Sequence, residues 1–364
     1  MKQDILIVGG YGAVGRHVVM ELIKTCPEKI IIAGRDLNKA NAFVQEIGYS
    51  LKTMQIDINK IEQFEQHLKP VHTVLMCVEA KDTTFVKSCI DNGVNYVDIS
   101  ASNRFFTETK QFEEKAIQNH VSCILGVGIA PGLSSLLAKR VADEMEVVNQ
   151  IDFTLMLGLG EQHGADGVRW FLEHLRTDFE VEGVVKKPFI NKHQAHFSQP
   201  LGTRDAYSFD LADRQILSET LNVPVNTYYC YDSTFITGLL HVLKKVRLLN
   251  ILKNQKIFAV FLKIFSSDKM SQNAKLSDTI GLHITATGLN TGKQVTHYGN
   301  IIGNNSSTIT AKVVAHTALE LDQNRYPTGV HYLSEVVSLD NVIEALDEAL
   351  TVEFQVARNR VSST

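Results

Sequence analysis

Three glycines near the start of the chain constrain its fold more than any other feature. The segment ILIVGGYGAVGR places Gly10, Gly12 and Gly15 after a β-branched apolar run and before an amphipathic stretch. In this strand–turn–helix context the first glycine permits a tight turn, the second lets a pyrophosphate approach the backbone, and the third lets helix and strand pack closely. The pattern predicts a dinucleotide site at a helix N-terminus, with a purely structural turn as the alternative. The loop residues expected to bind the cofactor are Gly9, Gly10, Tyr11, Gly12, Ala13, Val14 and Gly15.

Strand-like and helix-like segments alternate through the first 130 residues. Buried parallel strands connected by helices produce this alternation, because helices then cover both faces of the sheet. The sequence therefore predicts an α/β fold that opens with a doubly wound Rossmann domain, residues 1–130. Six short β-branched runs mark its strands, at 5–8, 30–33, 54–58, 74–78, 96–99 and 121–125.

The pattern changes after Ala130, where longer strand-like segments and helices predict a second α/β (α+β) domain. We assign residues 131–304 to this substrate and dimerisation domain and expect a mixed sheet in it. A hairpin is expected from the runs 279–288 and 294–302, because turn residues separate them. A long helical region is expected over 233–265, and helices over 307–322 and 339–350. The sequence does not decide whether residues 305–364 return to the first domain.

The end of the second predicted strand, IIIAGRD, bears on the choice of cofactor. Gly34 leaves space there and Arg35 supplies a guanidinium, whose fork of donors fits a 2′-phosphate. We therefore predict NADP rather than NAD. Asp36 is the alternative, because an acid at this strand end is typical of NAD-binding proteins.

Two later strand ends add cofactor candidates. Asp57 follows the third strand and would neighbour the adenine, or alternatively cap a helix before Lys60. Cys77 and Val78 end the fourth strand beside the switch point of the sheet, where ligands bind. They could equally be core residues.

Composition narrows the class of protein. The formal net charge of −4 lacks the basic footprint of a nucleic-acid-binding protein. The five cysteines are scattered without a C-x-x-C pair, so we expect neither a metal site nor disulfides, and read them as reduced thiols in a cytoplasmic protein. The opening MKQDILIVGG does not resemble a signal peptide, and no long uncharged apolar run predicts a transmembrane helix.

Longer stretches of the chain resemble the saccharopine dehydrogenase (reductase) family. They are VKSCIDNGVNYVDIS, ILGVGIAPGLSSLLAK, GLGEQHGADGVRWFLEHL and FSQPLGTRDAYSFDLADRQ, and the resemblance extends to GVHYLSEV. It implies a Rossmann domain, an α/β substrate domain that often forms a homodimer, and a nicotinamide cofactor. It also implies an NADP-dependent reductase or dehydrogenase that transfers hydride to or from an imine or secondary amine of an amino-acid-like substrate. Members often carry Gly-Pro after strand four, where this chain has Glu79-Ala80.

Three residues are candidates for the chemistry. Tyr96 and Asp98 lie two apart at the end of the fifth predicted strand, so they share one face of it. Asp98 would orient the nicotinamide or an amine, or else cap the turn toward Ser100–Ser102. His163, in GEQHG, titrates near neutrality and would donate a proton; a solvated loop histidine is the alternative.

Four residues are candidates for substrate binding. Pro131 and Gly132 precede a predicted helix, and the free N–H groups of that helix would hold a carboxylate or the nicotinamide amide. The alternative is that Pro131 and Gly132 only form a structural turn. Arg204 would clamp a substrate carboxylate beside Tyr207. Alternatively, Asp205 and Asp210 would pair with Arg204 at the surface.

No acid occurs between Asp232 and Asp268, whereas six Lys and Arg residues interleave with apolar ones there. We expect this stretch to pack on the substrate domain or a dimer partner, with peripheral contact to an anionic membrane as the alternative. Two other functions stay open beside the amine reductase. One is a reductase of the same fold acting on another small or lipid-linked substrate, and the other is a non-catalytic NADP(H)-binding sensor or scaffold.

Overall fold

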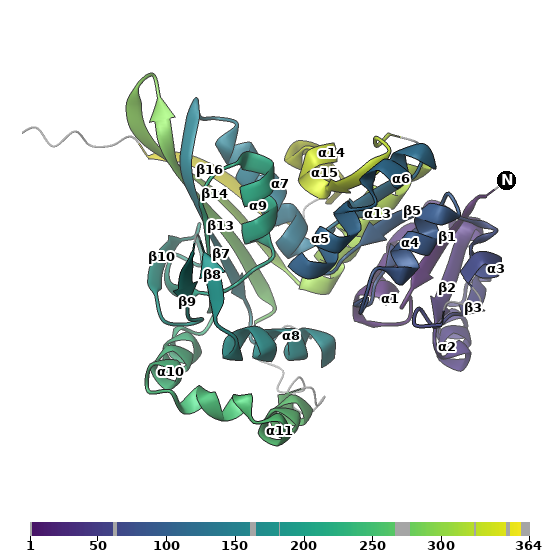
Figure 1. Ribbon diagram of the computed structural model, residues 1–364, viewed down its shortest axis with the longest axis horizontal. Helices are drawn as coiled ribbons and strands as arrows, with labels where there is room; N and C mark the ends of the chain where they lie inside the picture. The colour runs from purple at the N-terminus through teal and green to yellow at the C-terminus, as the bar shows by residue number, and fades with distance from the viewer. Residues whose placement is uncertain are drawn as a thin grey trace, which may run out of the picture. The chain divides into compact units, whose positions relative to one another are not determined.

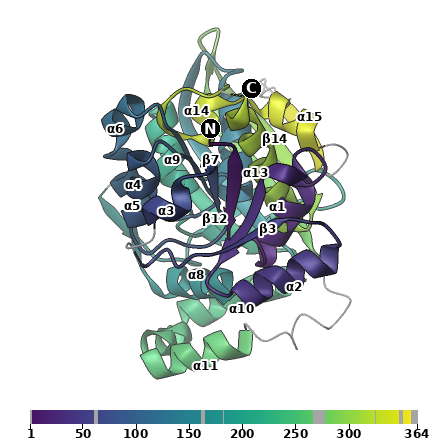
Figure 2. The same cartoon turned by 90° about the vertical axis from the view of Figure 1, so that its right-hand side faces the viewer.

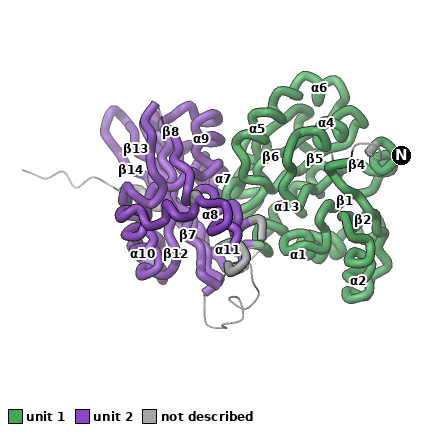
Figure 3. The backbone as a smooth tube through the Cα atoms, turned by 60° about the horizontal axis from the view of Figure 1, so that its bottom comes forward, with its two compact units in different colours: residues 1–133, 307–347 green, residues 134–306, 348–364 purple. Residues whose placement is uncertain are grey.

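The computed structural model describes residues 2–60, 64–160, 165–181, 183–265, 277–323, 325–346 and 350–357. The chain divides into two compact units (Figure 3). Unit 1 comprises residues 1–133 and 307–347, and unit 2 comprises residues 134–306 and 348–364. The chain therefore crosses between the units more than once, and each unit is described by itself.

Unit 1 is built on a seven-stranded parallel sheet of order β15-β6-β5-β4-β1-β2-β3 (Figure 1). The strand order reverses at β1, between β4 and β2, which is the switch point of a doubly wound fold. This confirms the predicted Rossmann fold. The strands are β1 (Asp4–Val8), β2 (Ile30–Gly34), β3 (Lys52–Gln55), β4 (Val71–Met76), β5 (Asn95–Asp98), β6 (Ser122–Leu125) and β15 (Gly329–Tyr332).

Helices flank both faces of this sheet. Figure 2 shows α3 to α6 on one side of the strands and α1 and α13 on the other. Because both faces are covered, β2 is buried along its whole length and reads as a continuous apolar run. The helices are α1 (Ala13–Leu22), α2 (Leu37–Ile47), α3 (Phe64–Leu68), α4 (Thr84–Asp91), α5 (Asn103–Lys110), α6 (Glu113–Gln118), α13 (Ser306–Asp322), α14 (Leu333–Val336) and α15 (Leu339–Leu346).

Unit 2 is built on a seven-stranded mixed sheet of order β10-β11-β12-β7-β13-β14-β16. Strands β12 and β7 are parallel and the other pairs antiparallel, so the predicted mixed sheet is confirmed. The strands are β7 (Val147–Leu157), β10 (Lys192–His196), β11 (Thr203–Ser208), β12 (Val225–Tyr231), β13 (Thr279–Asn290), β14 (Lys293–Asn304) and β16 (Leu350–Ala357), with β8 (Phe179–Val181) and β9 (Val184–Lys186) forming a separate hairpin.

The predicted hairpin is confirmed in β13 and β14. Its turn residues Thr291 and Gly292 both have positive φ, +49° and +74°. A two-residue turn with this geometry matches the right-handed twist of the strands it joins. The register therefore runs without interruption from Thr279 opposite Asn304 to Asn290 opposite Lys293.

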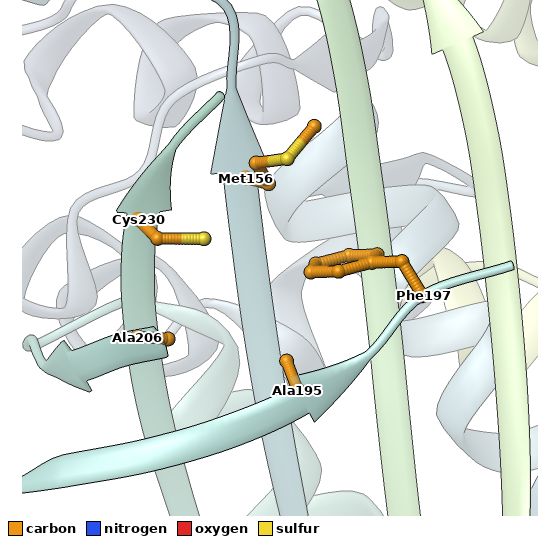
Figure 4. Close-up of a cluster of buried hydrophobic side chains, with 5 residues drawn as sticks. All are labelled: Met156, Ala195, Phe197, Ala206 and Cys230. Carbon is orange, nitrogen blue, oxygen red and sulfur yellow. The ribbon is translucent and has the colours of Figure 1, made fainter. Parts of the chain in front are cut away.

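Helices α7 (Ser134–Ala142), α8 (Ala165–Arg176) and α9 (Asp213–Leu221) also belong to unit 2. Helix α7 packs closely on β14, because a Cβ at Gly299 would lie 2.6 Å from Val141 Cγ2. The opposite face of the sheet carries a buried cluster in which Phe197 crosses above Gly281. Figure 4 shows its side chains, Met156, Ala195, Phe197, Ala206 and Cys230.

A carboxylate lies buried between α7 and α9. Asp213 has no exposed surface, and the hydroxyl of Ser134 donates a hydrogen bond to its Oδ1. Its Oδ2 has no partner among the residues that the structure describes. Burial raises the pKa of this carboxyl to about 7, because desolvation penalises the charged form.

The long helical region predicted over 233–265 is present, and the structure divides it into three helices. It forms α10 (Thr234–Lys245), a short 3-10 helix η4 (Leu248–Lys253) and α11 (Gln255–Phe265). Arg247 adopts φ +63° and so ends the right-handed path of α10. No glycine or proline lies near this break, so the sequence carries no conventional signal for it.

The C-terminal segment contributes to both sheets. Strand β15 pairs in parallel with β6, and β16 pairs antiparallel with β14. Neither was expected as a strand from the sequence. Helix α15 ends at Leu346, so the helix predicted over 339–350 is shorter, and Leu350 already belongs to β16.

Candidate functional site

The glycine loop closes the end of β1 tightly over the start of α1. Gly9 has φ +79°, a conformation that residues with a Cβ rarely adopt. Its N–H donates to Ala33 O on the neighbouring strand at 2.8 Å. A Cβ at Gly15 would lie 2.2 Å from Gly9 O, so only glycine lets the helix lie this close.

The N-terminus of α1 has the properties of an anion site. The helix begins at Ala13, its cap residue Gly12 makes no side-chain cap, and its first turn holds no acid. The first N–H groups of a helix have no intrahelical acceptor, and here Ala13 and Val14 supply two of them. The residues therefore fit a pyrophosphate at the positive end of the helix dipole.

The side chain of Tyr11, a residue of the glycine loop, lies over the end of β2. Its hydroxyl accepts a hydrogen bond from Asp36 N at 3.0 Å. A Cβ at Gly34 would lie 2.5 Å from that hydroxyl oxygen. The space that the sequence assigned to Gly34 exists, and the ring of Tyr11 fills it in this structure.

Arg35 and Asp36 have different environments. Asp36 is the N-cap of α2, and its Oδ1 accepts from the backbone N–H groups of Asn38 and Lys39 at 3.0 and 3.2 Å. Arg35 is exposed at the strand end. The Asp36 carboxylate thus caps α2, whereas the Arg35 guanidinium faces solvent.

Asp57 follows β3 and closes a tight turn. Its Oδ1 accepts from the backbone N–H and the side-chain amide of Asn59, at 3.1 and 3.0 Å. These hydrogen bonds hold the pKa of Asp57 below its usual value. The local turn is therefore its observed role, and its position near β2 keeps it beside the cofactor candidates.

Cys77 and Val78 follow β4 and contact the glycine loop. Cys77 N donates to Val8 O at 2.9 Å, and a Cβ at Gly9 would lie 2.4 Å from Val78 Cγ1. Burial raises the pKa of the Cys77 thiol to about 12, so the thiol is neutral at physiological pH. Both residues line the switch point of the sheet.

Asp98 ends β5 with no exposed surface. Its Oδ2 accepts two hydrogen bonds from Ser100, from the backbone N–H at 3.1 Å and the hydroxyl at 2.5 Å. Its Oδ1 is buried and finds no partner in the described part of the chain. Desolvation raises the pKa of the carboxyl to about 7, Ser100 opposes the rise, and the nearby Glu79 adds to it.

The contact with Ser100 is the turn alternative recognised in the sequence, and the free Oδ1 is the feature that sequence reasoning missed. Tyr96, on the same strand, is wholly buried, and burial raises the pKa of its phenol well above the usual value. Its hydroxyl also lacks a partner within the described residues. Tyr96 and Asp98 thus place two unpaired polar atoms inside unit 1.

The remaining candidates belong to different units or lie outside the described residues. Pro131 and Gly132 are buried in the irregular turn Ile129–Leu133 of unit 1, where Gly132 has φ +132° and α7 starts two residues later. His163 lies outside the described residues. Arg204 and Tyr207 are three apart on β11, so their side chains point to opposite faces of the second sheet.

Arg204 is not neutralised by the acids nearest to it in sequence. Asp205 pairs with Lys192 at 2.7 Å and Asp210 with Arg214 at 2.8 Å. The guanidinium donates to Asp232 O at 3.4 Å, while its Nε is buried without a partner among the described residues. Tyr207 is buried, with its ring stacked on His241 at 4.3 Å between centroids.

In the described ranges no three His, Cys, Asp or Glu side chains are grouped so that they could hold a metal ion. All five cysteines are free thiols. The fold and the glycine loop together define a dinucleotide-binding protein of the Rossmann class.

Residues 5–124 match the family described as the saccharopine dehydrogenase NADP binding domain. The resemblance inferred from the sequence is therefore confirmed over residues 5–124, and so is the predicted cofactor, NADP with NAD as the alternative. A search of curated protein sequences gave no match.

Two solved structures share the fold of nearly the whole chain. Saccharopine dehydrogenase (L-Glu forming) from Saccharomyces cerevisiae has 15% identity and a TM-score of 0.71, covering 98% of this chain and 100% of that one. Homospermidine synthase from Legionella pneumophila, in complex with NAD, has 13% identity and a TM-score of 0.65, covering 100% and 94%. At these identities the likeness shows the fold alone.

Proposed function

We propose that this protein is an NADP(H)-dependent oxidoreductase acting on an imine or secondary amine of an amino-acid-like substrate. The observation that carries the proposal is the buried Asp98, whose Oδ1 lacks a partner among the described residues at the strand ends where a doubly wound sheet binds ligands. Such an atom costs free energy unless a ligand satisfies it. The family resemblance supports chemistry at a C–N bond.

The cofactor supplies or accepts the hydride, and residues of unit 1 would hold it. The N–H groups at the start of α1 bind the pyrophosphate, and Arg35 binds the 2′-phosphate. The capping role of Asp36 supports NADP, because its Oδ1 is engaged by α2 rather than turned to a ribose. Val78 and Cys77 lie against the opposite side of the glycine loop.

Asp98 is partly protonated near neutral pH, because burial raises its pKa to about 7. In the protonated form Oδ1 donates a hydrogen bond, and we assign that bond to the nicotinamide end of the cofactor. Since Ser100 fixes Oδ2, the orientation of the carboxyl is set before the ligand arrives. Preorganised polar groups of this kind need little rearrangement during the reaction.

Arg204 would anchor a substrate carboxylate. Its support is the absence of an ion pair with Asp205 or Asp210, which bind other cations. A carboxylate would engage the fork of donors in bidentate fashion. The homodimer stays a prediction of the family resemblance, and the cytoplasmic location stays a prediction from the scattered cysteines.

The test is oxidation of NADPH in the presence of lysine-type amines combined with 2-oxo acids, followed by absorbance. We expect turnover with NADPH and a Michaelis constant for the oxo acid that rises on the order of tenfold or more in Arg204→Ala. Arg214→Ala, which breaks a pair with Asp210, is the matched control. Tight NADPH binding without turnover over the whole panel would instead establish a sensor or scaffold.

A further inference from the structure

Helix α10 turns a polar face toward the body of unit 2. Its buried side carries Thr237, His241 and Lys244, three residues spaced for one helix face. The ammonium of Lys244 donates to Leu175 O at 2.6 Å, and Nδ1 of His241 donates to Phe189 O at 2.8 Å. This face is therefore held by hydrogen bonds from Lys244 and His241 as well as by the stacking of His241 on Tyr207.

The opposite face of α10 is apolar and exposed. Phe235, Leu239, Val242 and Val246 are 74%, 41%, 53% and 64% exposed. Their spacing of four, three and four residues puts them on a single stripe, because a helix repeats every 3.6 residues. Leu248 and Ile251 of η4, 53% and 42% exposed, continue it. We call these six residues the apolar stripe.

The polarity of α10 is thus the reverse of a helix on the surface of a globular domain, which buries its apolar stripe. Burying an ammonium is costly, and exposing a contiguous set of large apolar side chains is unfavourable. The short helix α10 carries both of these unfavourable free-energy contributions. An arrangement of this kind marks a surface that another body covers.

The charge of the surface around the apolar stripe indicates which kind of partner covers it. The described cations around the apolar stripe, Lys245, Arg247 and Lys256, are exposed, and the sequence has no acid between Asp232 and Asp268. A two-fold dimer through this face would set the same cations against each other, because such an interface pairs a patch with itself. An anionic surface complements them.

We propose that the apolar stripe and its flanking cations form a peripheral docking surface for an anionic lipid bilayer. Helices α10, η4 and α11 lie at the lower edge of unit 2 in Figure 1. None of the described helices is long and apolar enough to cross a membrane. The apolar side chains would enter the boundary between headgroups and acyl chains, with the cations at the lipid phosphates.

The experiment is co-sedimentation of the full chain with vesicles of phosphatidylcholine alone and of phosphatidylcholine with phosphatidylglycerol. We expect binding only to the anionic vesicles, and weaker binding as salt rises. Val242→Glu/Val246→Glu should reduce the partition coefficient at least tenfold. Its matched control is Val184→Glu/Val185→Glu, because these β8–β9 valines are 60% and 65% exposed and lie outside the stripe. Lys245→Gln/Arg247→Gln should reduce binding on the order of tenfold.

Three results would overturn the proposal. The first is no binding to anionic vesicles, and the second is equal loss in the two valine pairs. The third is a dimer in sedimentation velocity that Val242→Glu/Val246→Glu dissociates, which would make a second copy of the chain the occupant. Circular dichroism of each variant checks that the fold is retained, so a loss of binding reports on the surface.

Discussion

Ser100 donates both its backbone N–H and its hydroxyl to the same oxygen of Asp98, Oδ2. The carboxyl is therefore held at one end and unpaired at the other, in a site without exposed surface. Because desolvation raises its pKa to about 7, a small change of pH near neutrality alters whether Oδ1 donates or accepts.

Asp98→Asn should remove a pH dependence of cofactor binding. In the wild type, the Kd for NADPH should rise as pH increases from about 6 to about 8, because the donating form is lost above its pKa. Asparagine retains a donor at every pH. The Kd of each protein is measured by fluorescence titration with NADPH. Protonation of the 2′-phosphate of the cofactor, whose pKa is about 6, affects both Kd values equally. The same slope in both would contradict the assignment.

Arg35→Ala should weaken NADPH binding by roughly 10- to 100-fold, the loss of a charge-assisted hydrogen bond to a phosphate. Binding of NADH should change by no more than about twofold, because NADH lacks the 2′-phosphate. Arg104→Ala is the control, since that side chain is 82% exposed and pairs only locally with Glu108. Tighter binding of NADH than of NADPH by the wild type would refute the predicted preference.

Gly34→Ala should lower the free energy of unfolding by about 1–3 kcal/mol, because the new methyl group would overlap the Tyr11 hydroxyl. Adding Tyr11→Leu should recover much of the loss, and a double-mutant cycle in urea measures this coupling. Gly238→Ala is the control, because apart from its chain neighbours and the adjacent backbone of α10 no atom lies within 4 Å of its added Cβ. Additive losses would mean that the two sites are independent.

Asp213→Asn should change how stability varies with pH. The folded pKa, about 7, exceeds the usual 3.8, so the folded state binds the proton more tightly than the unfolded one. The free energy of unfolding therefore falls as pH rises between these values, by up to about 4 kcal/mol. Asparagine should abolish that fall while still accepting from Ser134. Urea denaturation over this range tests it, with Asp210→Asn as the variant that should keep the slope.

The sequence predicted best what depends on local pattern. Gly10, Gly12 and Gly15 identify their loop because each role follows from the missing Cβ, and β2 shows as an apolar run because it is buried on both faces. Strand β16 was missed although Leu350, Val352, Phe354 and Val356 alternate with polar residues. Strand β15 was missed because its sequence, GVHY, contains no run of adjacent apolar residues.

The chemistry of the site was less visible because it arises from distant segments. No sequence pattern shows that Asp98 keeps a free oxygen or that Tyr11 fills the space above Gly34, because both depend on tertiary packing. The exposure of the apolar stripe was likewise hidden, since a helical period does not say which face turns inward. In α10 the hydrogen bonds of Lys244 and His241 decide it.

Strands β15 and β16 also set an order for biosynthesis. Chains emerge N-terminus first and domains generally fold as units, yet the edge strand β15 of the first sheet and the edge strand β16 of the second come from the last part of the chain. Until the ribosome has translated them, β6 and β14 present unpaired edges that can pair with other chains. The nascent protein must therefore keep two open sheet edges protected at once, and stalled or truncated products would be the ones most prone to aggregate.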